Sequence, residues 1–393
     1  MTRRLLTMAG LACLIGLLVG CAAWFGPSID FTASTAEGPY PLVVQFTPVC
    51  DETIALYTWT FGDGETSNDP SPVHIYREAG TYTVSLVAQL ADGGVAEETK
   101  EAWIVVRAPM AKAETQYIYW ISFAAGAIWR GPVGGGTKER VTGGGYPTAL
   151  DVVDGWVYWA DANSEAICRV RTDGTDKETL IAGQHYITDI YVVPETDSIF
   201  WVRAPDFYGG KCGGVYTASL SDLDPESLVL YGPAADRYAG HVAFDAVGQA
   251  LYWTVTHFPR DYDLAGRDAI RMTPSAGSTE TVLYKGIGEC SALELDTIPG
   301  YAAEHVYWMD HSDCIETADG ELVLTTLYRI DVDGSGIHAV LQDEEMTPYL
   351  AVDRMEGKLY FTSFDGLERC NLDGSNRELL YEDGAMAGIS LAP

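Results

Sequence analysis

Short runs of alternating apolar and polar residues extend over most of the chain after residue 28. They are rich in Val, Ile, Tyr, Trp and Thr and are separated by Gly, Asp and Pro. Such alternation places every second side chain on one face of a strand, and helix-period apolar patterns are scarce. The pattern predicts an all-β chain. With 393 residues and 47% hydrophobic content, the chain is long enough for more than one folded domain.

An aromatic pair recurs six times in the second part of the chain. The pairs are Tyr119-Trp120, Tyr158-Trp159, Phe200-Trp201, Tyr252-Trp253, Tyr307-Trp308 and Tyr360-Phe361. Their spacing of 39 to 55 residues is typical of one four-stranded propeller blade. Another apolar strand precedes the pair in repeats 2 to 6, and Asp-Gly dipeptides follow at hairpin positions. We expect blades with an inner strand, the aromatic strand and two outer strands, and aromatic pairs that pack between blades.

The two ends of this repeat region complement each other. The stretch "APMAKAE" before repeat 1 does not resemble an inner strand, whereas "AGISLAP" (387–393) reads as an inner strand with no aromatic strand after it. Pairing the C-terminal strand with the aromatic strand of repeat 1 would complete the sixth blade and remove the open sheet edges. The sequence therefore predicts a closed ring of six blades.

The repeats resemble the YWTD propeller of the low-density-lipoprotein-receptor family (LDL-receptor class B repeats), which has six blades. The stretch "LERCNLDGSNRELL" (367–380) is especially similar, and the resemblance covers residues 115–393. It implies that the fourth residue of the motif, an Asp, forms hydrogen bonds at the seams between blades. Only repeats 2 and 5 have it, as Asp161 and Asp310. The other repeats carry Ser122, Arg203, Val255 and Ser363.

Residues 29–107 form a separate unit of short strands. The stretch "YTWTFGDGETSNDPSPVHIYREAGTYTVSLVAQ" resembles the polycystic-kidney-disease (PKD) domain, an immunoglobulin-like β-sandwich frequent in bacterial surface proteins. Gly62 and Gly64 flank Asp63 in a predicted tight turn that requires positive φ. His74 is interpreted as a structural residue, and Thr60 replaces the Asp of the family's motif. The resemblance implies a spacer or adhesive module without chemistry of its own.

The first 20 residues have the pattern of a targeting signal. A basic start and an apolar run end at "LVGC", which resembles the bacterial lipobox and implies cleavage before Cys21 and acylation of that residue. Two or more acyl chains give a stable membrane anchor. The alternative is an ordinary secretory signal that contains a cysteine. We expect residues 21–28 and 108–114 to be linkers, and an extracytoplasmic location at the outer membrane or the cell surface.

The net charge indicates which partners are disfavoured, and the cysteines indicate which disulfide bonds could form. A formal net charge of −32 disfavours nucleic-acid binding. Six cysteines follow Cys21 in a compartment that permits disulfides. We predict a Cys290–Cys314 bond and, on weaker grounds, a Cys168–Cys212 bond. Cys50 and Cys370 stay unassigned.

The turns between the second and third strands indicate where a ligand would bind. Counted from the second aromatic residue to the next apolar residue, they span 6 to 8 residues in repeats 1, 2 and 6 and 14 to 19 residues in repeats 3 to 5. Loops commonly carry function on a rigid scaffold. The candidate binding residues on this arc are Phe207, Tyr208, His257, Phe258, Arg260, Tyr262, Arg267 and His311. The alternative is that these are elaborated turns without a ligand.

Catalytic and metal-binding motifs have little support. No serine-hydrolase elbow, zinc-protease helix or glycine-rich phosphate loop is present. Asp310, Asp313, Glu316 and Asp319 could hold calcium, although their spacing is not that of an EF-hand. His241 on an inner strand could face the channel or be a structural residue.

These observations favour a non-catalytic binding or adhesion protein for an envelope or extracellular protein, peptide or glycan, with no cofactor assigned. The alternatives are a propeller lyase or glycoside hydrolase that acts at the central channel, and a structural component of an envelope complex. Acids and a His converging on the channel would favour the enzyme, and an aromatic patch would favour binding.

Overall fold

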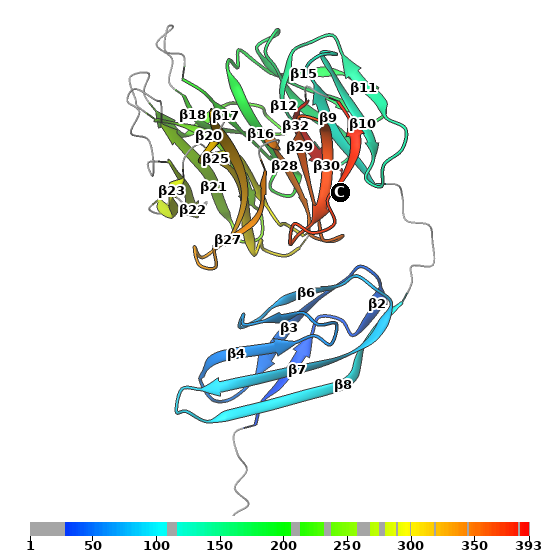
Figure 1. The fold of residues 1–393 in the computed structure, drawn as a ribbon, viewed down its shortest axis with the longest axis vertical. Coiled ribbons are helices and arrows are strands. Elements are labelled where there is room, and N and C mark those ends of the chain that lie inside the picture. The colour runs from blue at the N-terminus through cyan, green and yellow to red at the C-terminus, as the bar shows by residue number, and fades with distance from the viewer. Residues whose placement is uncertain are drawn as a thin grey trace, which may run out of the picture. The chain divides into compact units, whose positions relative to one another are not determined.

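The computed structural model describes residues 28–107, 116–205, 213–231, 237–257, 268–274, 280–287, 290–298, 300–317, 320–343, 346–383 and 386–392. The chain divides into two compact units, Met1–Ala108 and Pro109–Pro393. Both are built from strands (Figure 1). Within the described ranges there is one short 3-10 helix, η1 (Pro194–Thr196), and no helix there is long and apolar enough to cross a membrane.

The first unit is a sandwich of two sheets. One sheet has the order β1-β3-β6 and the other the order β2-β8-β7-β4-β5. The strands are β1 (Asp30–Ala33), β2 (Glu37–Pro39), β3 (Leu42–Val49), β4 (Ile54–Thr60), β5 (Thr66–Ser67), β6 (Val73–Tyr76), β7 (Gly80–Leu90) and β8 (Val95–Arg107). Alternating residues of β3 and β7 are buried and meet the aromatic rings of Phe31, Trp59 and Phe61 in one core. The immunoglobulin-like sandwich is confirmed.

The predicted glycine turn follows β4. Gly62 and Gly64 have φ values of 87° and 103°. A Cβ on Gly62 would lie 2.5 Å from the carbonyl oxygen of Thr83, so the neighbouring strand leaves room only for glycine. His74 is buried, stacks on Phe61 with ring centroids 4.0 Å apart, and places Nε2 2.6 Å from Asp63 Oδ2. Its interpretation as a structural residue is confirmed.

The second unit contains six four-stranded sheets, which are the blades of a propeller. Blade 1 consists of β32 (Met386–Leu391), β9 (Tyr117–Ser122), β10 (Ala127–Pro132) and β11 (Glu139–Gly143). Blade 2 consists of β12 (Pro147–Val153), β13 (Trp156–Asp161), β14 (Ala166–Arg171) and β15 (Glu178–Ala182). Blade 3 consists of β16 (Ile187–Val193), β17 (Ser198–Arg203), β18 (Gly213–Ser219) and β19 (Glu226–Tyr231).

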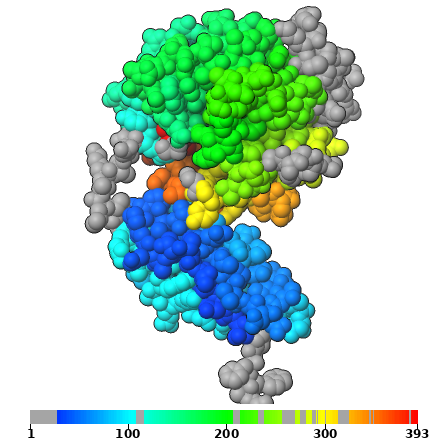
Figure 2. All heavy atoms as spheres, turned by 180° about the vertical axis from the view of Figure 1, so that it is seen from behind, coloured from blue at the N-terminus to red at the C-terminus, as the bar shows by residue number. Residues whose placement is uncertain are grey.

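The remaining blades have the same strand order. Blade 4 consists of β20 (Arg237–Asp245), β21 (Ala250–His257), β22 (Asp268–Pro274) and β23 (Thr281–Ile287). Blade 5 consists of β24 (Cys290–Leu295), β25 (His305–Thr317), β26 (Gly320–Asp331) and β27 (His338–Asp343). Blade 6 consists of β28 (Met346–Asp353), β29 (Lys358–Ser363), β30 (Gly366–Asn371) and β31 (Glu378–Glu382). In Figure 2 the green atoms belong mainly to blades 2 and 3.

The ring is closed by the C-terminal strand. β32 pairs antiparallel with β9, with Ile389 opposite Trp120, and so provides the inner strand of blade 1. The inner strands β32, β12, β16, β20, β24 and β28 contact one another in cyclic order around a central channel. The predicted closure is therefore confirmed.

The aromatic pairs are packing residues, as expected. All twelve side chains are buried and belong to hydrophobic clusters shared by adjacent sheets. Asp161 Oδ1 accepts hydrogen bonds from the amides of Tyr146 and Asn163, each 3.0 Å away. Tyr146 lies in the connection from blade 1 to blade 2, so Asp161 holds the junction between these blades.

The long turn expected in blade 5 is built largely from strand residues. Strands β25 and β26 continue beyond the sheet as a paired hairpin that ends at Thr317 and Gly320. The stretch contains alternating apolar and polar residues around an Asp-Gly dipeptide, which is a hairpin signal. The additional residues of this repeat therefore extend two strands.

Candidate ligand pocket at the channel mouth

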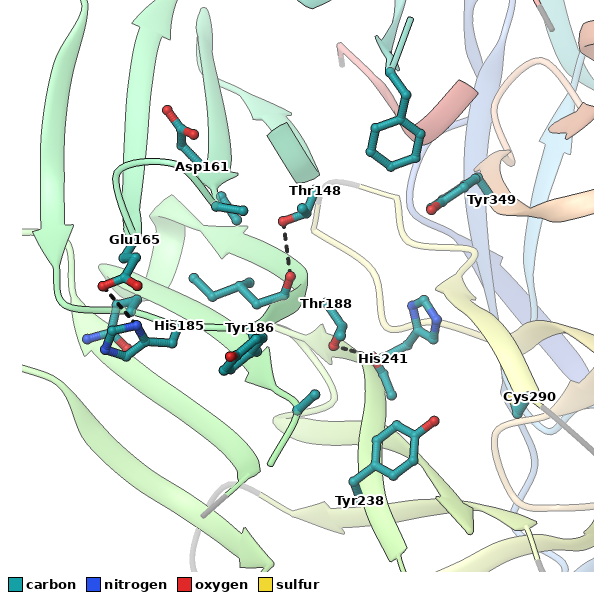
Figure 3. A pocket seen from close by; sticks show the side chains of 17 residues that line it. Thr148, Asp161, Glu165, His185, Tyr186, Thr188, Tyr238, His241, Cys290 and Tyr349 are labelled. Carbon is teal, nitrogen blue, oxygen red and sulfur yellow. Dashed lines mark hydrogen bonds and ion pairs between the residues drawn. The ribbon is translucent and has the colours of Figure 1, made fainter. Parts of the chain in front are cut away.

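A cavity of about 700 Å³ opens at the end of the propeller where the inner strands begin, which we call the mouth rim (Figure 3). We call the cavity the channel-mouth pocket. Residues of five inner strands line it: Thr148, Thr188, Gly240, His241, Cys290 and Tyr349. The pocket therefore lies over the channel and is shared by most of the ring.

Irregular strand starts position these side chains. The register of every inner strand shifts by one or two residues at its beginning, as at Pro147/Ala149 in β12 and Ile187/Asp189 in β16. Such bulges redirect side chains and are frequent beside functional sites. Thr148 and Thr188 occupy bulge positions, and their hydroxyls donate to carbonyl oxygens at the start of the next blade, 3.0 and 2.9 Å away. The bulges thus join adjacent blades and shape the pocket floor.

Polar side chains of blade 2 and of its connection to blade 3 form one wall. Asp161 and Glu165 follow β13, and His185 and Tyr186 precede β16. His185 Nδ1 lies 2.9 Å from Glu165 Oε2, and Figure 3 shows the two groups paired at the edge of the pocket. This wall offers carboxylates for hydrogen bonding to a ligand.

Aromatic side chains surround the opening. Phe123, Tyr186, Tyr238 and Tyr349 line the pocket, and 61% of Tyr186 is exposed. Tyr146 stacks against Phe123 with ring centroids 5.6 Å apart and is also exposed. Exposed aromatic rings next to a cavity are typical of ligand and partner sites.

Acidic residues occupy the channel below the pocket. Burial raises the pKa of Asp151 on β12 to about 6, although the Val192 amide and the Ser390 hydroxyl counteract this. Burial, with the charges of Asp189 and Asp151, raises the pKa of Glu294 on β24 well above its ordinary value. On β20, His241 Nδ1 lies 3.5 Å from Asp189 Oδ2. His241 faces the pocket, which was one of its two sequence-based interpretations.

Two of these acids also stabilise the ring. Asp151 Oδ2 accepts a hydrogen bond from the amide of Val192 at 2.8 Å, and Asp189 Oδ2 accepts one from the amide of Val242 at 2.9 Å. Each amide lies on the inner strand of the following blade, whose channel edge has no neighbouring strand. The carboxylates therefore satisfy backbone donors that the fold exposes to the channel.

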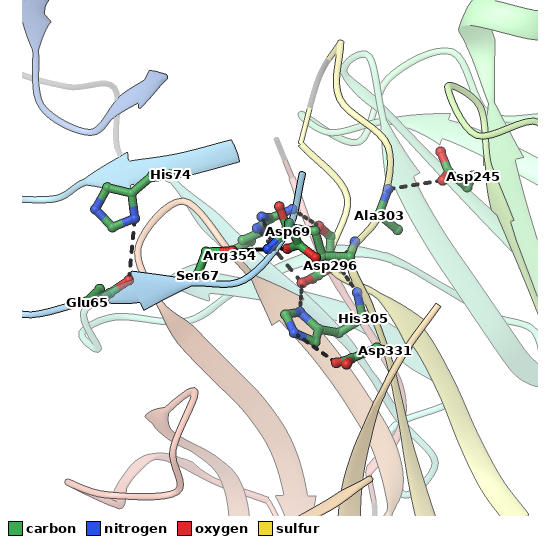
Figure 4. A network of polar contacts seen from close by, with 11 residues as sticks. Glu65, Ser67, Asp69, His74, Asp245, Asp296, Ala303, His305, Asp331 and Arg354 are labelled. Carbon is green, nitrogen blue, oxygen red and sulfur yellow. Dashed lines mark hydrogen bonds and ion pairs between the residues drawn. The ribbon is translucent and has the colours of Figure 1, made fainter. Parts of the chain in front are cut away.

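At the opposite end of the channel, which we call the far rim, residues 296–298 and 300–304 lie between β24 and β25. The amide of Ala303 donates to Asp245 Oδ2 of blade 4 at 3.0 Å, and Arg354 of blade 6 pairs with Asp296 and Glu304 (Figure 4). Thr297 hydrogen-bonds the hydroxyl of Tyr191, which comes from blade 3. The described residues between β24 and β25 therefore contact blades 3, 4 and 6.

A turn motif anchors this segment. Asp245 and Asp353 end the inner strands of blades 4 and 6, and Asp296 directly follows that of blade 5. Their Oδ1 atoms accept backbone amides of the connections that follow. Asp296 Oδ2 also lies 2.6 Å from His305 Nδ1 (Figure 4). Asp296 and Arg354 are almost completely buried.

Most of the binding residues expected from the sequence cannot be placed. Phe207, Tyr208, Phe258, Arg260, Tyr262 and Arg267 lie outside the described residues, as does Cys21. His257 ends β21, but its side chain is not described. His311 is described on β25, where its Nδ1 lies 2.6 Å from the Thr325 hydroxyl. The arc of blades 3 to 5 as a binding surface stays a prediction.

The disulfide and calcium predictions also remain untested. Cys290 lines the pocket, whereas the side chain of Cys314 is not described. Cys168 is buried with Sγ 3.8 Å from the Thr179 hydroxyl, and Cys212 lies outside the described residues. Asp310 is buried, but the other expected calcium ligands have no described side chains. Among the described side chains, no group of three or more His, Cys, Asp or Glu is arranged to hold a metal ion.

Sequence reasoning missed the wall in blades 1 to 3. Phe123 and Phe364 stand three residues after the second aromatic residue of repeats 1 and 6, and both are exposed. An aromatic residue at the same position of two repeats, in the turn after the aromatic strand, could have indicated this part of the wall from the sequence. Tyr186 and His185 had no such signal, because they lie in a short connection whose exposure depends on how blades 2 and 3 meet.

Comparisons with known proteins agree with this architecture. The family model for the PKD domain matches residues 26–106. Over 78 residues the chain is 49% identical to collagenase ColA of Bacillus cereus, covering 18% of this chain and 8% of the collagenase. Over 279 residues it is 26% identical to low-density lipoprotein receptor-related protein 5 of Mus musculus, covering 63% of this chain and 17% of the receptor. The chain thus matches less than a fifth of either relative's length.

The propeller fold also has solved counterparts. A chain in the crystal structure of a nidogen/laminin complex superposes with a TM-score of 0.54 and 16% identity, over 71% of this chain and 98% of that chain. At this identity the similarity concerns the fold alone. Together with the closed ring of six blades and the repeated aromatic pairs, the comparisons show that the chain contains a PKD domain followed by a six-bladed propeller of the YWTD type.

Proposed function

We propose that this chain is a lipid-anchored cell-envelope protein whose propeller binds an extracellular ligand in the channel-mouth pocket. The observation that carries the proposal is the cavity of about 700 Å³ over the channel, bordered by the exposed Tyr186. Pockets of this size with aromatic walls and a few polar groups are typical ligand sites.

A protein or peptide ligand agrees best with the rim. Tyr146, Tyr186 and Phe364 expose large rings there, and Tyr is enriched among residues that dominate binding energy. The similar propellers support the same choice, since one occurs in a nidogen/laminin complex and another in a receptor-related protein.

The N-terminal part would hold the propeller away from the membrane. Acylation at Cys21 would provide the anchor, and the PKD sandwich would act as a spacer. The PKD match and the 49% identity to a collagenase over 78 residues support an extracytoplasmic location.

Binding can be tested with the mature chain carrying Cys21→Ser, immobilised and exposed to envelope and culture-fluid proteins. Captured partners are identified by mass spectrometry, and their affinity is measured for wild type and Tyr186→Ala. We expect Tyr186→Ala to weaken binding about tenfold or more. The control Leu228→Ala removes a 47% exposed apolar side chain from β19, outside the pocket, and should bind as wild type. Equal affinity of all three proteins would refute the pocket as the binding site.

A second candidate function is catalysis by a lyase or hydrolase. Asp151, Asp189, Glu294 and His241 lie on neighbouring or facing inner strands, and a carboxyl with a raised pKa is suited to general-acid catalysis. Against it, the carboxylates of Asp151 and Asp189 already accept backbone amides. Turnover of a glycan library by wild type, abolished in Glu294→Gln, would establish the enzyme.

A further inference from the structure

The channel below the pocket is acidic on facing sides of the ring. We propose that it binds one organic cation, an ammonium or guanidinium group, carried by the ligand in the channel-mouth pocket. This inference rests on the proposed function and names the chemical group that the ligand inserts. It concerns Glu294 above all, because that carboxyl has no part in the backbone bonds formed by Asp151 and Asp189.

Strand register places Glu294 in the channel. Leu150, Ile190, Leu293 and Ile389 lie opposite the second aromatic residue in their blades, and the next residues are Asp151, Tyr191, Glu294 and Ser390. Leu293 and Leu295, on either side of Glu294, are buried in the cluster around Trp308. The Glu294 side chain therefore points away from that cluster.

Equivalent register positions on β12 and β24 direct Asp151 and Glu294 into the same channel, and the electrostatics agree with this placement. The charges of Asp189 and Asp151 act on Glu294, although blades 2 and 5 stand on opposite sides of a six-membered ring. The charge of Glu294 acts on Tyr191 of blade 3. Like charges in a narrow channel repel one another, and a bound cation would remove that repulsion.

The surroundings suit a cation better than a neutral group. None of the described residues that line the pocket is a lysine or an arginine. Tyr186, Tyr238 and Tyr349 offer aromatic faces along the path, and such faces attract ammonium and guanidinium groups. Asp161 and Glu165 add carboxylates at the mouth.

The far rim favours a single inserted group. Residues 296–298 and 300–304 lie at that end of the channel and bond to Asp245, Arg354 and Tyr191. A ligand would therefore reach the acids from the mouth rim. A metal ion fits less well, because Asp151 Oδ1 accepts from Val152 and Ser390 while Oδ2 accepts from Val192. The described side chains provide no group of three ligands for it.

Calorimetric titration of the Cys21→Ser chain at pH 7.5 tests the proposal with four probes. They are the peptide acetyl-Gly-Gly-Lys-Gly-Gly-amide, its norleucine counterpart, n-butylguanidinium and calcium chloride. We expect the lysine peptide or the guanidinium to bind, and the norleucine peptide to bind about tenfold more weakly or not at all. Tighter binding of the peptide than of the small cation indicates a protein side chain as the source, and the reverse indicates a small free cation.

Glu294→Gln keeps the shape of the side chain and should reduce cation affinity about tenfold. Glu195→Gln on η1, an exposed acid between β16 and β17, changes the net charge equally and should leave affinity unchanged. Binding should weaken from pH 7.5 to pH 5 as the channel acids gain protons. The titratable groups that interact with Glu294 are Asp151, Asp189 and Tyr191, and Asp189 in turn interacts with His241 and Tyr349.

Four results would each overturn the cation site. The lysine and norleucine peptides could bind equally, or Glu294→Gln could bind the cation as tightly as wild type. Calcium could be the sole probe that binds, or no probe could bind at all. The proposed function would still stand if Tyr186→Ala weakened binding of a captured partner. Loss of the Tyr186 effect would instead refute the function.

Discussion

The carboxylate of Asp151 accepts a hydrogen bond from the amide of Val192, 2.8 Å away on the inner strand of the next blade. The same relationship joins Asp189 to Val242, and the hydroxyl of Ser390 accepts from the amide of Val152 at 3.0 Å. Three consecutive seams of the ring thus use a side chain of one inner strand to bond the channel edge of the next.

Asp151→Asn should destabilise the propeller by about 1–3 kcal/mol, because the amide group that replaces the carboxylate disturbs a buried set of hydrogen bonds. Chemical denaturation of the full chain at pH 7 measures the change. Asp154→Asn is the control, since Asp154 is exposed in the adjacent turn and Asn tolerates its φ of 51°. Equal stability of the two variants would show that the seam bond contributes little.

The raised pKa of Asp151 predicts a pH dependence of propeller stability. Its folded pKa of about 6 lies above its ordinary value of 3.8, so the folded chain binds more protons between these values. Stability should therefore fall as pH rises from about 4 to 6 and then level off. Glu294 contributes in the same direction. Hydrogen exchange of β12 and β24 between pH 4 and pH 7 measures this effect, and Asp151→Asn should reduce it.

The sandwich should respond to pH in the opposite direction. Burial alone would raise the pKa of Asp63, but the hydrogen bond and charge of His74, with the backbone amide of Glu65, lower it. This contribution to stability is present above pH 3.8 and is lost as pH falls through the lowered pKa. Asp63→Asn should therefore increase hydrogen exchange of β6 and β7 at pH 7 and much less at pH 3. The same increase at both values would contradict an ionic contribution.

Removing residues 386–393 should abolish cooperative unfolding of the propeller. β9 would lose its inner partner and β12 would lose Ser390, so two edges of the ring would open. Thermal melting followed by circular dichroism measures the loss, and a synthetic peptide of residues 384–393 added in excess should restore part of it. An unchanged melting curve would refute closure by this strand.

Trp159→Ala and Tyr186→Ala separate packing from binding. Trp159 is 2% exposed, so its truncation should cost about 3–5 kcal/mol of stability. Tyr186 is 61% exposed, so its truncation should leave the melting temperature within about 2 °C of wild type. Similar losses of stability in both variants would show that Tyr186 is a structural residue.

Local pattern and repeat spacing were sufficient to predict both folds, the strand order within a blade and the closing strand. These features depend on the burial of every second residue, on turn residues such as Asp173-Gly174 and on the aromatic pairs. All three signals lie within a single repeat, so the sequence of that repeat is enough to recognise them. The structural role of His74 was also predictable, because its partner Asp63 lies in the preceding turn of the same motif.

The pocket was decided by the tertiary structure. Thr148, His185 and Tyr186 belong to bulges or short connections, and their exposure depends on how neighbouring blades meet around the ring. Glu294 and Asp151 stand 143 residues apart in sequence, yet ring closure makes them face the same channel and raises the pKa of both. The sequence by itself determined the six blades, because each buries its own repeated residues. Only the closed ring determined the acidic channel, because the interaction between acids of different blades depends on their distance, and that distance is set by how the blades are arranged around the ring.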